Sequence, residues 1–106
     1  MSFPTPPAIT RALQKLGTDL SRARRRRRFT RASVAERAGV SEATVKRLES
    51  GDGRVALESL ARVLNVFNEL GRLDRLIDTA DDDLGIQLMD EQLPKRVRRR
   101  RVTGAL

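Results

Sequence analysis

The stretch that most constrains the fold is Thr30–Gly51, which reads TRASVAERAGVSEATVKRLESG. Its first residue and Ser41 are favourable N-cap residues, and each precedes a short segment with apolar positions at helical spacing. Gly39 stands between these segments, at the position after a helix where a positive φ is easy only without a Cβ. The pattern therefore predicts two helices, over 31–38 and 42–50, joined by a tight turn.

Helical spacing also continues on both sides of this stretch. Apolar residues three and four apart predict a first helix from Ala8 to about Ala23, which Gly17 weakens locally. The arginine run Arg24–Arg28 either continues that helix or ends it. Two further helices are predicted over Leu57–Leu64 and Val66–Thr79. With no repeat and no strand-rich region, the chain is predicted to be an all-α protein with five helices.

The flanks of this helical region differ from it in composition. Three prolines in residues 1–7 predict an N-terminal arm, and the helical domain is expected over 8–80. Asp81–Asp83 breaks the apolar pattern, so 81–106 is predicted to be a linker and a basic tail. Three adjacent acids do not converge on a metal ion, and we interpret this run as a linker at the end of a helix.

Positive charge is concentrated in two places. The net charge is +8, yet Leu20–Arg31 contains seven arginines and Lys95–Arg101 contains six basic residues, with no acid in either stretch. Such clusters favour a polyanionic partner, either nucleic acid or an anionic membrane surface. The five consecutive arginines cannot all face one groove, so some must point to solvent or to acidic residues.

Composition narrows the range of functions. The chain has no Cys, His, Trp or Tyr, so it has no disulfide framework, no Cys/His metal site and none of the commonest nucleophile–base pairs. We therefore predict that the chain is not an enzyme and uses no cofactor or metal. No apolar run is long enough to span a bilayer, and the N-terminus lacks the order of a signal peptide. These features predict a soluble cytoplasmic protein.

The two helices and their turn, together with LESLARVL at 57–64, resemble the XRE family of lambda-repressor- and Cro-like helix-turn-helix regulators. The resemblance covers about Leu20 to Leu64, and the helix starts, the turn glycine and the following helix fall at the family's spacing. It implies a five-helix, lambda-repressor-like DNA-binding domain with a C-terminal extension, whose third helix lies in the major groove of double-stranded DNA. It also implies a structural ion pair between Arg24 and Glu49.

The same resemblance places DNA contacts at the start of the second helix and along the third. By position these residues are Thr30, Arg31, Ser33, Ser41, Glu42, Ala43, Thr44, Lys46 and Arg47. Arginine and lysine can bind guanine or phosphate, hydroxyl groups can donate to phosphate, and Ala43 can meet a thymine methyl group. Glu42 departs from the glutamine common in the family. Its carboxylate can accept from cytosine N4, but it repels phosphate.

The fifth predicted helix carries more apolar residues than a small core needs, which indicates a dimer or partner surface. We assign dimerisation to Phe67, Leu70, Leu73 and Ile77. Two segments resemble narrower groups: SEATV is similar to HipB-like antitoxins, and Asp83–Arg100 resembles tails of regulators associated with HipA-type kinase toxins.

These resemblances imply a bacterial antitoxin that represses its own operon as a homodimer and binds a HipA-like kinase toxin. The basic tail Lys95–Arg101 would then contact the DNA backbone or the toxin. The alternative is a protein-interaction module that keeps the helix-turn-helix as a scaffold and docks an acidic partner through its basic tail.

Overall fold

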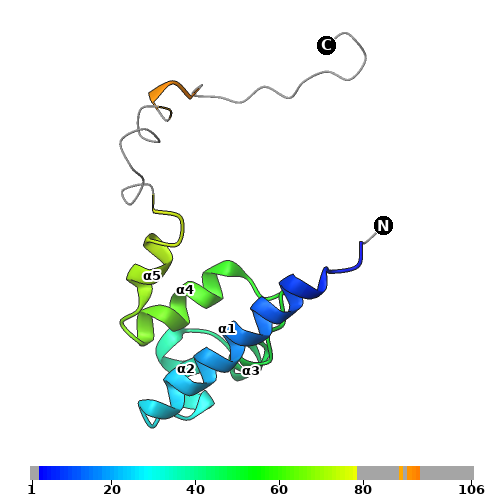
Figure 1. The fold of residues 1–106 in the computed structure, drawn as a ribbon. Coiled ribbons are helices and arrows are strands. Elements are labelled where there is room, and N and C mark those ends of the chain that lie inside the picture. Colours follow the sequence, from blue (N-terminus) through cyan, green and yellow to red (C-terminus); the bar gives the residue numbers. More distant parts are fainter. Residues whose placement is uncertain (1–2, 79–88, 90, 94–106) are drawn as a thin grey trace. The chain divides into compact units, whose positions relative to one another are not determined.

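The computed structural model describes residues 3–78, 89 and 91–93 of the 106-residue chain. Five helices are labelled in Figure 1: α1 (Pro7–Arg26), α2 (Arg31–Ala38), α3 (Glu42–Glu49), α4 (Leu57–Val66) and α5 (Leu70–Asp74). All five lie in the first of two compact units, which spans residues 1–76; the second unit spans 77–106. The described residues contain no β-strand, and the predicted all-α class is confirmed. The acidic run 81–83 and the basic tail 95–101 lie outside the described residues.

Local capping explains where α2 and α3 begin. The Thr30 hydroxyl accepts from the Ser33 amide at 3.0 Å, and the Ser41 hydroxyl accepts from the Thr44 amide at 3.0 Å. Gly39 ends α2 with a φ of 73°, and its amide donates to the Ala35 carbonyl. The predicted bounds of α2 are therefore correct, while α3 ends one residue earlier than predicted.

A single apolar core lies between the first four helices. α1 packs on α3, and α2 packs on both α3 and α4, an arrangement that can be followed in Figure 1. Val34 of α2 and Val45 of α3 are fully buried at the centre of this core. Each such side chain contributes about 1.5–3 kcal/mol relative to an exposed one. The other buried residues are Leu20, Ala35, Ala38, Leu48, Val63 and Phe67.

Gly17 is required where α1 crosses the end of α3. A Cβ at this position would stand 2.6 Å from the Glu49 carbonyl oxygen and 2.7 Å from the Leu48 carbonyl oxygen. Gly51, with a φ of 81°, also lies against α1, and a Cβ there would stand 2.9 Å from Gln14 Cα and from the Leu13 carbonyl oxygen. The sequence indicated only a weak point in a helix at Gly17, whereas the structure shows a close approach between two backbones.

The fifth helix differs from the prediction. The segment predicted as one helix over 66–79 is divided, because α4 extends to Val66 and α5 covers only Leu70–Asp74. Asn68 has a φ of 59°, a left-handed conformation that asparagine tolerates better than most residues, and it ends α4. The Glu69 amide then donates to the Leu64 carbonyl at 2.8 Å, which closes the turn.

This division changes the assignment of Phe67. Its side chain is 3% exposed and belongs to the core of the single chain, so it does not form part of the predicted dimer surface. The other residues of that prediction remain accessible: Leu70 is 37% exposed, Ile77 is 88% exposed and Leu73 is half-buried. The apolar stripe predicted from the sequence is therefore wide partly because one of its residues, Phe67, packs inside the domain.

Candidate nucleic-acid interface

One side of α3 is exposed along its whole length. Val45 and Leu48 point into the core, and the opposite side presents Glu42, Ala43, Lys46 and Arg47 to solvent. A helix with one buried edge and one exposed polar edge can enter the major groove of DNA without disturbing the core.

Hydroxyl groups at the starts of α2 and α3 are engaged in local hydrogen bonds. The Ser41 and Thr44 hydroxyls lie 2.8 Å apart, and the Thr44 hydroxyl also accepts from Arg47 at 3.4 Å. Ser33 accepts from the Arg37 side chain at 3.2 Å and is half-buried, whereas Thr30 is exposed. The oxygens of Thr30 and Ser41 accept the capping bonds, which leaves the Thr30 proton for a phosphate oxygen. The Ser41 proton is available in the same way when Thr44 is the donor in the bond between the two hydroxyls.

The structure brings Arg24 of α1 and Glu49 of α3 together. Arg24 Nε donates to Glu49 Oε2 at 2.6 Å, and Arg24 Nη2 donates to Oε1 at 3.2 Å. Arg24 Nη1 also donates to the Phe29 carbonyl at 2.8 Å. The two side chains are only 11% and 6% exposed, so this pair joins helices inside the domain and presents no base-reading group.

Arg31 joins the same carboxylate from the first turn of α2. Its Nε donates to Glu49 Oε1 at 3.0 Å, and its side chain is 45% exposed. Burial opposes ionisation of Glu49, but the hydrogen bonds and charges of Arg24 and Arg31 outweigh that effect and hold the pKa of Glu49 below its ordinary value. The sequence pattern did not indicate this second contact.

The arginine run divides into residues bound to other parts of the domain and residues that are not, although only Arg24 is withdrawn from solvent. Arg27 donates to the Ala23 and Phe67 carbonyls at 2.9 and 3.0 Å, and its guanidinium lies 4.9 Å from the Phe67 ring centre. With Arg24 bound to Glu49, two of the five arginines tie the end of α1 to other parts of the domain. Arg25, Arg26 and Arg28 are exposed like Arg27 but lack its contacts with Phe67, so they form the part of the run that can meet a polyanion.

Arg54 is an exposed cation that the sequence prediction left out of the site. It lies in the loop after α3, where its Nε and Nη2 donate to the Asp52 carboxylate at 3.1 and 3.3 Å. A hydrogen bond from the Arg54 side chain, aided by one from its amide, lowers the pKa of Asp52. The arginine in GDGRV, directly after the third helix, is the sequence signal that marks it.

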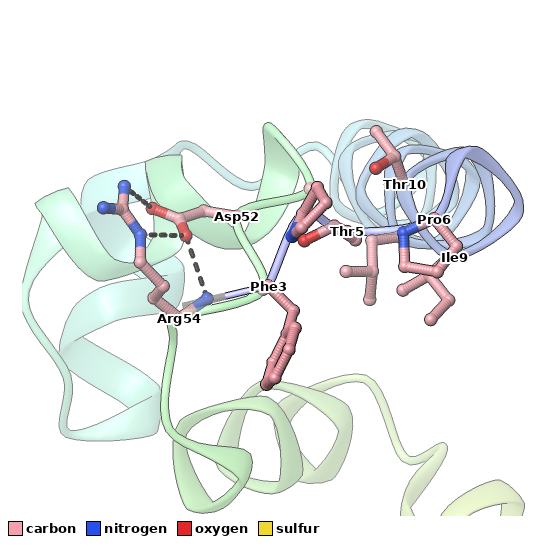
Figure 2. A pocket seen from close by; sticks show the side chains of 11 residues that line it. Phe3, Thr5, Pro6, Ile9, Thr10, Asp52 and Arg54 are labelled. Atoms are coloured by element: carbon pink, nitrogen blue, oxygen red, sulfur yellow. Dashed lines mark hydrogen bonds and ion pairs between the residues drawn. The ribbon is translucent and has the colours of Figure 1, made fainter. Parts of the chain in front are cut away.

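Beside this loop is a hollow of about 580 Å³ next to the N-terminal arm. Figure 2 shows Asp52 and Arg54 on one side of the hollow and Pro6 and Ile9 on the other. Phe3 also lines the hollow, and its side chain is 84% exposed. The lining carries no set of groups for acid–base or nucleophilic chemistry.

Elsewhere in the described part of the chain, no three acidic, His or Cys residues come together to hold a metal ion, and no helix is long and apolar enough to cross a membrane.

The fold and the exposed edge of α3 define a helix-turn-helix domain, the class of domain found in DNA-binding regulators. A family model described as a helix-turn-helix domain matches residues 15–84. This is more than half of the chain, and the chain belongs to that family. No curated protein and no solved structure matches the chain.

Proposed function

We propose that the chain is a sequence-specific transcriptional repressor that binds double-stranded DNA through α3. The observation that carries this proposal is the exposed edge of α3 in a helix-turn-helix domain, with the 45%-exposed Arg31 of α2 bound to Glu49 at the end of α3. Arg31, Ala43, Lys46 and Glu42 would read bases, while Ser41, Thr44 and Arg47 would hold the backbone. Thr30 and Ser33 would contact phosphate at the start of α2.

Binding as a homodimer would place two α3 helices on half-sites about 10 base pairs apart. An apolar hollow of about 280 Å³ between α1, α4 and α5 supports an interaction surface here, with Leu16, Leu64 and Leu73 in its lining. Leu70 and Ile77 are the remaining exposed residues of the proposed dimer surface. Phe67 also lines this hollow, but its side chain is only 3% exposed and offers little surface to a partner.

The proposed biological setting is a bacterial, cytoplasmic toxin–antitoxin pair in which the chain is the autoregulating antitoxin of a HipA-type kinase toxin. The support is the resemblance of SEATV at 41–45 and of residues 83–100 to regulators of that kind. Most of the second segment lies outside the described residues. Co-purification with the product of a neighbouring kinase-like gene tests this setting.

Selection of duplexes from a random-sequence library by the full chain, followed by gel-shift titration, tests the proposed DNA recognition. We expect one enriched sequence, bound far more tightly than a scrambled duplex. Lys46→Ala should lower the affinity for that sequence and relax the preference at one or two base pairs, because a direct base contact contributes about 1–3 kcal/mol. Absent or sequence-independent binding would favour the alternative, a protein-interaction module built on this scaffold.

A further inference from the structure

Glu49 links three helices through one carboxylate. It closes α3, and it accepts hydrogen bonds from Arg24 of α1 and Arg31 of α2. Oε2 accepts a hydrogen bond from Arg24 Nε at 2.6 Å. Oε1 accepts one from Arg24 Nη2 at 3.2 Å and one from Arg31 Nε at 3.0 Å. The Glu49 side chain is only 6% exposed, so both guanidinium groups are bound to an anion that is largely withdrawn from water.

The two arginines are held in different ways. Arg24 uses its Nε, Nη1 and Nη2 groups inside the protein and is 11% exposed. Arg31 is 45% exposed and donates through Nε to Glu49, the one hydrogen bond of its guanidinium within the described part of the chain. Its Nη1 and Nη2 groups therefore keep their four N–H donors for another acceptor.

We propose that Glu49 is a positioning residue for DNA binding, which holds Arg31 by its Nε edge so that both Nη groups are presented to the duplex. This inference rests on the proposed function. A guanidinium fixed in this way offers two parallel donors, which match a phosphate or the O6/N7 edge of guanine. Because Arg31 is already ordered, it loses less side-chain entropy on binding DNA than a free arginine would. For one long side chain this lowers Kd by about two- to tenfold.

A double-mutant cycle between Glu49→Gln and Arg31→Ala tests this role in the full chain. The probe is the duplex enriched by the wild-type chain from a random-sequence library, and Kd is measured by fluorescence anisotropy at a temperature where circular dichroism shows every variant folded. Arg31→Ala should weaken binding about tenfold when residue 49 is Glu, as expected for a base or phosphate contact. It should weaken binding by less than about threefold when residue 49 is Gln, because Arg31 is then no longer pre-oriented.

Arg37 provides the matched control. It is an exposed arginine of α2 whose Nε donates to the Ser33 hydroxyl at 3.2 Å and whose guanidinium lies 4.5 Å from the Phe29 ring centre. Glu49 accepts from Arg24 and Arg31, and Arg37 is not among its partners in the described part of the chain. Arg37→Ala should change Kd by the same factor with Glu or Gln at position 49. A purely structural Glu49 would lower the unfolding transition but leave the two mutations additive in DNA binding.

The two ways in which this inference can fail are distinguishable. If the wild-type chain selects a duplex and Arg31→Ala has equal effects in both backgrounds, the positioning role is overturned and the proposed function stands. If the wild-type chain enriches no duplex, the proposed function is overturned, and the positioning role with it.

Discussion

Replacing Gly17 by Ala should destabilise the domain, although alanine is the better helix former. In an exposed helix the change would add about 1 kcal/mol of stability. Here the new Cβ would stand 2.6, 2.7 and 2.8 Å from Glu49 O, Leu48 O and Gly51 N, all backbone atoms. Ordinary contact begins near 3.4 Å, so α1 must move by several tenths of an ångström against the end of α3.

The magnitude follows from these two opposing terms. Overpacking a well-packed site costs typically about 1–3 kcal/mol, and three simultaneous backbone contacts place Gly17→Ala at the upper end of that range. After the gain in helix propensity is subtracted, the free energy of unfolding should fall by about 2 kcal/mol. For a domain of this size the loss corresponds to a decrease in Tm of roughly 8–16 °C.

Urea unfolding followed by circular dichroism measures the effect, with Gly71→Ala as the matched control. Gly71 also lies in a helix, but the nearest atom to its Cβ position is the flexible Arg75 Nη1, at 3.1 Å. Gly71→Ala should therefore be neutral or stabilise the domain by up to about 1 kcal/mol. A Gly17→Ala variant as stable as the wild type would refute the close approach of α1 and α3.

Three further predictions concern charge and capping. Folding lowers the pKa of Glu49, so the ionised carboxylate stabilises the domain at any pH above the ordinary glutamate pKa of roughly 4.3. This stabilisation is lost as the pH falls through the lower pKa of the folded state. Glu49→Gln should lower the free energy of unfolding at pH 7 by about 3 kcal/mol, the lower end of the range for loss of one partner of a buried pair. It should also flatten the pH dependence of urea unfolding below pH ~4.5. A dependence as steep as that of the wild type would contradict this role of Glu49. Ser41→Ala should cost about 1 kcal/mol in the same assay and Ser41→Gly only a few tenths, because glycine is itself an acceptable N-cap; equal losses would argue against the cap. Removing residues 95–106 should make the slope of log Kd against log salt shallower by several units if the six basic residues contact DNA, and an unchanged slope would show that they do not.

The helix-turn-helix could be predicted closely because its signals are local. An N-cap hydroxyl bonds an amide three residues along the chain, and a glycine after a helix sets its own φ. Neither signal depends on how the chain packs. The bounds of α2 therefore follow from Thr30 and Gly39 alone, and the start of α3 follows from Ser41.

The boundary between α4 and α5 could not be predicted in this way. Apolar residues continue at helical spacing through Val66, Phe67 and Leu70, and no glycine or proline interrupts them. The interruption is the left-handed conformation of Asn68, one of several conformations open to asparagine, and it is stabilised by the bond from Glu69 to Leu64. Phe67 then enters the core rather than a dimer surface.

The contact between Glu49 and its second partner, Arg31, depends on the packing of α2 against α3, because the two residues are 18 positions apart in the sequence. The resemblance to a known family indicated Glu49 as a partner for Arg24, but one carboxylate has room for two guanidinium groups only when both helices converge on it. Gly17 permits that convergence, since its missing side chain lets α1 reach the Glu49 carbonyl. The carbonyl oxygen of residue 49 is the atom nearest to the Cβ position of Gly17, and the Glu49 side chain binds an arginine of the proposed DNA surface. The packing of α1 and the proposed orientation of Arg31 therefore both depend on the same residue of α3.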